Sequence, residues 1–125
     1  MVRPLSATTL TLAVLLAAAT SAQAQNADNG KTVFKQICGV CHAAVAGKTL
    51  IGPTLFGVVG RKSGSVAGYQ YSDGNRAANL TWDAATLDRY LADPRGVVAG
   101  TKMTYGGLKD DQKRHDLIAY LDTLK

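Results

Sequence analysis

The sequence contains no glutamate, and all nine of its acidic residues are aspartates. Its 125 residues include only two histidines and two cysteines. Few groups suited to proton transfer are present, which argues against acid–base catalysis, and two cysteines cannot form the disulfide framework of a small secreted scaffold. Hydrophobic residues make up 46% of the chain and charged residues 18%, a balance too apolar for a disordered polypeptide. The length fits one compact domain and excludes a multi-domain enzyme.

Residues 1–24 have the features of a secretory signal peptide. Arg3 is their only charge, an apolar run follows it, and the small-x-small site Ala22-Gln23-Ala24 comes last. We expect cleavage after this site, which leaves residues 25–125 as one exported, basic domain. A retained membrane anchor is the alternative, but the apolar run is much shorter than the about 20 residues that span a bilayer.

Helical periodicity predicts three helices in the rest of the chain. The first covers residues 28–41 with Asp28 able to cap it, the second starts at Thr81 as cap and stops before Pro94, and the third covers residues 110–124. Their apolar faces carry Val33, Phe34, Ile37, Cys38 and Cys41 in the first, Leu87, Tyr90 and Leu91 in the second, and Leu117, Tyr120, Leu121 and Leu124 in the third.

The segment between the first two helices is rich in glycine. Residues 47–74 hold seven of the thirteen glycines and show no sustained alternation of the strand type. A long irregular loop is unusual inside so small a domain, unless a group other than protein side chains gives the loop a surface to wrap around. We therefore expect an all-α protein with a large non-protein group at its centre.

The segment Cys38-Gly39-Val40-Cys41-His42 identifies that group. Cys-x-x-Cys-His is the attachment site of a c-type haem, in which the two thiols add to the porphyrin vinyl groups and the adjacent imidazole faces the iron. Two other interpretations are weaker. A thioredoxin-like redox pair requires a βαβ context, and a zinc site requires four ligands, more than the two cysteines and at most two histidines supply.

The iron has a second axial position, for which the chain offers few donors. Met103 is the only methionine after the signal segment, and His115 is the only other histidine. His115 lies on the third predicted helix, away from the apolar face, and is expected to point to solvent. Met103 lies in a glycine-flanked loop that can approach a flat cofactor. A lone loop methionine more often fills a gap in a core, but a haem needs a sixth ligand and we favour Met103.

From about Gly30 to Leu124 the sequence resembles the class I c-type cytochromes, in the branch that includes mitochondrial cytochrome c and its close bacterial relatives. Gly30 and Phe34 match the family's helix-crossing pair, and Leu117 and Tyr120 match the partners on the other helix. The resemblance implies the small cytochrome c fold, in which three main helices and Gly-rich loops wrap around one covalently attached haem.

The resemblance also implies roles for individual residues. Pro53 matches a proline that packs on the haem histidine, and the backbone oxygen preceding that proline is expected to accept the imidazole N–H of His42. Tyr90 matches a residue whose hydroxyl approaches the methionine sulfur, and Thr101 belongs to the methionine loop with Met103. The expected partners of the haem propionates and of a buried water are Arg61, Tyr71, Asn75 and Trp82. Without the resemblance, these residues would be ordinary core aromatics, an ordinary loop amide and a solvated loop charge.

Three features depart from the family pattern. Ala99 stands where the methionine loop usually has a proline, Tyr105 stands where a phenylalanine is typical, and the loop from His42 to Pro53 is one residue shorter. Losing the fixed dihedral of a proline should make the methionine loop easier to open. We still expect Met103 to bind the iron.

The expected function is one-electron transfer by a soluble monomer rather than an enzymatic reaction, because two protein ligands leave the iron no place for substrate. We expect a bacterial periplasmic carrier whose basic haem edge docks on acidic patches of redox partners such as a bc-type complex, an oxidase, a reaction centre or a dehydrogenase. The lysines expected at that edge are Lys31, Lys35, Lys48, Lys102 and Lys109, and the aspartates expected on the third helix are Asp110, Asp111, Asp116 and Asp122.

Two alternatives remain open. A haem enzyme or ligand-binding sensor would use a labile sixth site, and a membrane-tethered carrier would keep residues 1–24. Nucleic-acid binding is not expected, because the lysines and arginines are scattered and no known reader motif is present.

Overall fold

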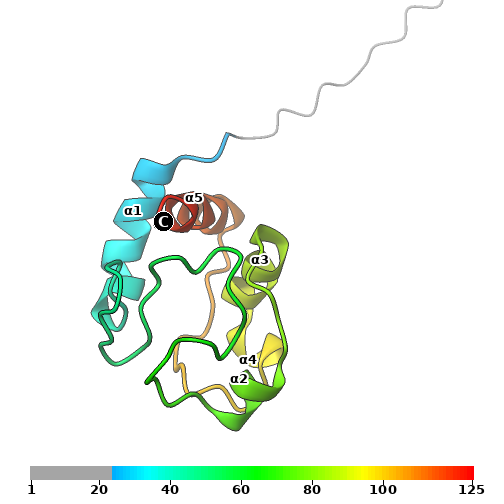
Figure 1. Cartoon of the computed structure of the whole chain (residues 1–125). Coiled ribbons are helices and arrows are strands. Elements are labelled where there is room, and N and C mark those ends of the chain that lie inside the picture. Colours follow the sequence, from blue (N-terminus) through cyan, green and yellow to red (C-terminus); the bar gives the residue numbers. More distant parts are fainter. Residues whose placement is uncertain (1–23) are drawn as a thin grey trace, which may run out of the picture.

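The structure, a computed structural model, describes residues 24–125, and its regular secondary structure is helical (Figure 1). Within that range the only β-type pairing is a single antiparallel bridge between Lys62 and Thr81, so the expected all-α class is confirmed. The elements are α1 (Ala27–Gln36), the 3-10 helix η1 (Cys38–Val40), α2 (Asp73–Ala77), α3 (Ala84–Ala92), α4 (Pro94–Val97) and α5 (Asp111–Asp122).

The first and last helices cross in close contact and form the frame of the molecule (Figure 1). Gly30 lies at the crossing, where a Cβ atom on this residue would lie 1.9 Å from the carbonyl oxygen of Asp116 and 2.9 Å from Cβ of Tyr120. The rings of Phe34 and Tyr120 pack beside it with their centroids 5.4 Å apart. Only glycine permits this separation of the two backbones, as the resemblance implied.

A buried carboxylate also joins α1 to α5. Asp116 is only 4% exposed, and its Oδ1 accepts hydrogen bonds from the backbone N–H of Asn26 at 2.8 Å and from Nε2 of Gln112 at 2.8 Å. Burial alone would raise the pKa of Asp116, but these hydrogen bonds outweigh it and lower the pKa below its usual value. Asp116 lies on the third helix as expected, but it faces α1 and is buried, so its charge is not displayed on the surface of that helix.

The predicted helices are present with different ends. Asn26 caps α1 in place of Asp28, by accepting two backbone N–H groups on its side-chain oxygen, and the α-helix ends at Gln36, before η1. Asp83 caps α3 in place of Thr81. The third prediction was closer, since Asp110 caps α5.

Two short helices were not predicted. α2 is capped by Ser72, whose hydroxyl accepts from the backbone N–H of Asn75, and α4 begins with Pro94 directly after its cap Asp93. Both are too short for a periodic apolar pattern to show. Residues 43–72 contain no helix and run as a long loop around the centre of the molecule (Figure 1), as the glycine content predicted.

The predicted signal peptide at residues 1–24 lies outside the described residues except for Ala24. Among residues 24–125, no helix has the length and apolar character needed to cross a membrane.

Replacing Gly30 by alanine is expected to separate α1 from α5. The new methyl group would overlap the backbone of α5, so the free energy of unfolding should fall by about 1–3 kcal/mol, measured by guanidinium titration of the haem-loaded protein. Gly106→Ala is the matched control, since a Cβ there meets nothing within 4 Å. Equal losses from the two variants would contradict the close-contact explanation.

Asp116→Asn should lower stability at neutral pH more than in acid. Because the folded-state pKa of Asp116 is depressed, its contribution is present above the unfolded value near 3.8 and is lost as the pH falls through the folded value. The measurement is the unfolding free energy of parent and variant from pH 7 to pH 3. Asp122→Asn, which removes only an exposed pair with Lys125, should change stability by less than about 1 kcal/mol. A constant gap between parent and Asp116→Asn would contradict the assignment.

Candidate functional site

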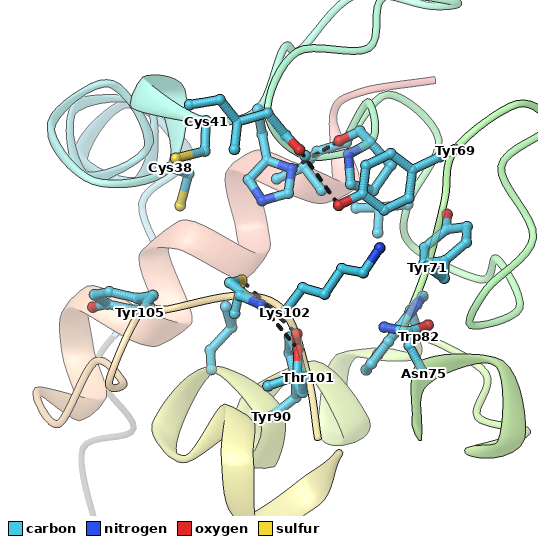
Figure 2. A pocket seen from close by; sticks show the side chains of 18 of the residues that line it. Cys38, Cys41, Tyr69, Tyr71, Asn75, Trp82, Tyr90, Thr101, Lys102 and Tyr105 are labelled. Atoms are coloured by element: carbon cyan, nitrogen blue, oxygen red, sulfur yellow. Dashed lines mark hydrogen bonds between the residues drawn. The ribbon is translucent and has the colours of Figure 1, made fainter. Parts of the chain in front are cut away.

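A cavity of about 750 Å³ lies between η1, α3, α5 and the long loops. All eleven residues proposed from the sequence line it, and they are Cys38, Cys41, His42, Pro53, Arg61, Tyr71, Asn75, Trp82, Tyr90, Thr101 and Met103. Its lining is predominantly apolar, with a few polar groups that converge on it (Figure 2). This is the usual character of a cofactor site.

The two cysteines stand at one end of the cavity, where α1 gives way to η1 (Figure 2). The carbonyl of Cys38 accepts hydrogen bonds from the backbone N–H groups of Cys41 and His42, at 3.0 and 2.9 Å, which folds the motif into a tight turn. Burial, with a smaller effect of Cys41, raises the pKa of Cys38 to about 11. A reactive redox thiol has a lowered pKa, so the thioredoxin-like interpretation is disfavoured.

The His42 ring is held firmly in one orientation. Its Nδ1 lies 2.7 Å from the carbonyl oxygen of Pro53, so the donor is Nδ1–H and Nε2 is left as the basic nitrogen. The acceptor is the carbonyl of Pro53 itself and not the oxygen preceding it, which corrects the expectation from the resemblance. Gly52 leaves room for the ring, because a Cβ there would lie 2.3 Å from Cε1 of His42. Burial lowers the pKa of His42, which favours the neutral form that a metal requires.

Met103 enters the cavity from the loop that follows α4. The hydroxyl of Tyr90, on α3, donates to Sδ of Met103 at 3.8 Å, as the resemblance implied. The backbone N–H of Met103 donates to Oγ1 of Thr101 at 3.3 Å, which bends the loop toward the cavity. Burial raises the pKa of Tyr90, so its hydroxyl remains a donor at neutral pH.

Two buried polar atoms of the cavity lining have no hydrogen-bond partner among residues 24–125. They are Nε of Arg61 and Oδ1 of Asn75. The Nη1 and Nη2 groups of Arg61 donate to the carbonyls of Phe56 and Thr54, at 3.1 and 3.0 Å. The Nε–H group is therefore free for an anion, and burial lowers the pKa of this half-buried guanidinium. A buried cation without a counter-ion is costly, so the site fits a group that brings its own carboxylates.

The groups that could bind those carboxylates gather at the end opposite the cysteines. Figure 2 shows Tyr71, Asn75 and Trp82 on that side. The Tyr71 hydroxyl accepts from the backbone N–H of Val66 at 3.1 Å and keeps its own proton to donate. Trp82 is buried and packs on Tyr90 with ring centroids 4.7 Å apart. The cavity therefore has thiols at one end and donors at the other, as a haem with vinyl and propionate edges requires.

Sequence reasoning missed several residues that line the cavity. Tyr69 stacks edge-on against Tyr71 with centroids 4.7 Å apart, and its hydroxyl donates to the carbonyl of Ile51 at 3.4 Å, which joins two distant parts of the long loop. Tyr105 lines the cavity from the methionine loop. Four of the five tyrosines line the cavity. Tyr69 and Tyr105 stand two positions from the expected site residues Tyr71 and Met103 in the sequence, and this proximity was the available signal.

The other predicted donors are arranged differently. His115 lies outside the cavity on α5, partly exposed, with Nε2 3.4 Å from Oδ1 of Asp88, as expected for a residue that does not bind the iron. The described residues contain no group of three or more His, Cys, Asp or Glu side chains able to hold a metal ion.

Comparisons with known proteins agree with this geometry. The family model for cytochrome c matches residues 27–125. The chain belongs to the cytochrome c family. It is 48% identical over 96 residues to cytochrome c2 of Rhodopila globiformis, covering 77% of this chain and 91% of that protein. It is 46% identical over 111 residues to cytochrome c2 of Blastochloris viridis, covering 88% and 87%.

A solved structure supports the same assignment. Cytochrome cH from Methylobacterium extorquens superposes with a TM-score of 0.74 at 45% identity, over 78% of this chain and 98% of that one. Cytochromes c of this family are electron carriers with covalently attached haem c. The chain is therefore a monohaem electron carrier with the small cytochrome c fold.

Removal of the Arg61 charge should make the haem easier to oxidise. A nearby cation disfavours the additional positive charge of the oxidised iron, so Arg61→Gln should lower the midpoint potential, by on the order of 1 kcal/mol or some tens of millivolts. Potentiometric titration of both variants provides the measurement. Arg95→Gln is the control, because Arg95 is exposed on α4 and lies outside the cavity. Equal shifts would mean that Arg61 acts only through the net charge of the protein.

Proposed function

We propose that Cys38 and Cys41 attach the haem through thioether bonds and that His42 and Met103 are its axial ligands. One observation carries the proposal: the two thiols, an imidazole oriented through Nδ1 and a thioether sulfur all line a single cavity. These are the ligand types of c-type haem sites. When bound, the haem supplies a reversible one-electron change at its iron.

The protein's own residues determine how readily that change occurs. Pro53 fixes the His42 ring and raises its basicity through the 2.7 Å contact at Nδ1. Tyr90 donates to the Met103 sulfur, and the apolar lining excludes water. With His42 and Met103 both bound to it, the iron would have no coordination site left for a substrate, so we infer a carrier and not an enzyme.

The site also supports a mode of docking. Val40 and Ile51 line the cavity near its mouth and are 69% and 75% exposed. Lys48 is exposed in the long loop that also carries Ile51, and Lys102 lines the cavity from the methionine loop. We infer that a redox partner covers this apolar mouth while acidic groups on the partner face the lysines, which gives weak, salt-sensitive association of a monomer. Candidate partners are a bc-type complex, an oxidase, a reaction centre or a dehydrogenase.

We infer further that the carrier is exported to the bacterial periplasm after removal of residues 1–24. The resemblance of these residues to a secretory signal and the similarity to bacterial cytochromes c2 support this inference. Mass spectrometry of the purified protein tests it, with a chain beginning at Gln25 plus one haem as the expected mass. An intact N-terminus would favour a tethered carrier.

Met103→Ala tests the axial ligand. The variant should lose the sulfur-to-iron absorption band of the oxidised protein and show a lower midpoint potential, because a thioether stabilises reduced iron. Gly106→Ala, in the same loop but outside the cavity lining and with nothing within 4 Å of the added Cβ, should retain both properties. An unchanged spectrum in Met103→Ala would show that another residue binds the iron, and tight carbon monoxide or cyanide binding by the parent at neutral pH would favour a haem enzyme.

A further inference from the structure

The backbone of the methionine loop, residues 98–109, is hydrogen-bonded to the rest of the protein at its two ends. Its middle is held by side-chain contacts, from the Lys102 ammonium to the carbonyl of Gln70 and from the Tyr90 hydroxyl to Sδ of Met103. No backbone-to-backbone hydrogen bond is made by residues 102–107 within the described chain. The N-terminal end is fixed by buried Val98, whose N–H donates to the carbonyl of Pro94 at 2.9 Å. The position of Met103 therefore depends on how firmly the C-terminal end is held.

Three hydrogen bonds hold that C-terminal end. The backbone N–H of Leu108 donates to the carbonyl of Leu91 at 2.7 Å, and the Lys109 ammonium donates to the carbonyl of Ala92. The third comes from α5, where Nη1 of Arg114 donates to the carbonyl of Leu108 at 2.9 Å. Leu108 is thus bound on both sides, by α3 through its N–H and by α5 through its carbonyl.

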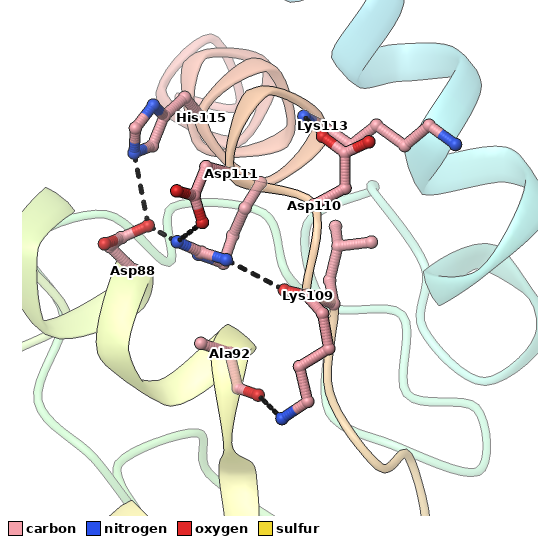
Figure 3. A network of polar contacts seen from close by, with 9 residues as sticks. Asp88, Ala92, Lys109, Asp110, Asp111, Lys113 and His115 are labelled. Carbon is pink, nitrogen blue, oxygen red and sulfur yellow. Dashed lines mark hydrogen bonds and ion pairs between the residues drawn. The ribbon is translucent and has the colours of Figure 1, made fainter.

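Arg114 makes this contact with a guanidinium that is itself fixed. The residue is only 7% exposed. Its Nε donates to Oδ1 of Asp88 at 2.6 Å and its Nη2 to Oδ1 of Asp111 at 2.8 Å (Figure 3). Each of the three nitrogens has a different acceptor, an arrangement that the planar fork of arginine permits and the single ammonium of lysine does not.

We propose that Arg114 is a positioning residue for Met103: by clamping the Leu108 carbonyl from a guanidinium fixed by Asp88 and Asp111, it closes the methionine loop over the cavity. The inference rests on the proposed role of Met103. Arg114 touches neither the cavity nor the methionine, since it is absent from the lining, and acts through the loop backbone. The hydrogen bond to Asp88 also raises the pKa of Arg114, so the clamp stays charged.

A simpler role for Arg114 would be to join α3 to α5 without affecting the loop. The two roles predict different effects on how easily an external ligand reaches the iron. A loop clamp sets the fraction of molecules in which Met103 has left the iron, whereas a helix link sets only global stability. An external ligand that competes with Met103 reports the first quantity, since its apparent affinity scales with the fraction of open molecules.

The test is imidazole binding to the oxidised, haem-loaded protein, monitored by loss of the sulfur-to-iron band. Arg114→Lys keeps a positive charge, but its single nitrogen cannot take the place of three guanidinium nitrogens that each face a different acceptor. Imidazole affinity should therefore rise about tenfold. Asp88→Asn keeps the arginine but weakens its anchor and should raise affinity by a smaller factor in the same direction. Hydrogen exchange at the Leu108 amide should accelerate in parallel in both variants, while amides of α1 change less.

Asp116→Asn is the matched control on the same helix. It weakens the α1–α5 junction without contacting the loop, so it should lower global stability and leave imidazole affinity at the parent value. If Arg114→Lys lowers global stability but its imidazole affinity matches that of Asp116→Asn, the clamp is refuted and the helix link is sufficient. If the parent lacks the sulfur-to-iron band, the assignment of Met103 fails instead.

Discussion

A protein interior of this size normally fills itself with side chains, but here the side chains surround a cavity of about 750 Å³. The cavity imposes the rest of the structure. Helices alone would pack together and close it, so a long loop over residues 43–72 runs around it. Two buried polar atoms of the lining, Nε of Arg61 and Oδ1 of Asn75, have no hydrogen-bond partner among the described residues. Because buried polar atoms are normally hydrogen-bonded, these two indicate that the cavity holds a group with its own acceptors and donors.

The contact between α1 and α5 places the haem-attachment motif. Gly30 lets the two backbones meet, and Asp116 fixes the start of α1 by accepting the N–H of Asn26. Because the cysteines follow α1 directly, the position of that helix determines where the thiols lie relative to the cavity. A junction far from the chemistry therefore sets the geometry of covalent attachment, and it does so through backbone contact and one buried carboxylate.

The correct and the incorrect predictions from the sequence have the same physical explanation. The motif ending at His42 is local, so its spacing alone indicates haem attachment. The partner of His42 was misassigned by one carbonyl, because spacing along the chain does not fix which oxygen faces a ring. Burial of Asp116 was missed because helical periodicity describes one helix and not the neighbour that crosses it. The free nitrogen of Arg61 depends on which carbonyls occupy the other two, a property of the folded loop alone.

The same reasoning explains how a loop without a proline at Ala99 can hold a ligand. A proline would restrict the backbone at that end, but the structure supplies other constraints. A Cβ on Gly74 would lie 1.8 Å from the carbonyl oxygen of Ala99, so α2 packs directly against the loop there. At the other end Leu108 is bound through both its N–H and its carbonyl. Tertiary contacts at the two ends thus restrict the loop in place of the fixed backbone dihedral that a proline at position 99 would supply. Between these ends, the hydroxyl of Tyr90 contacts Met103.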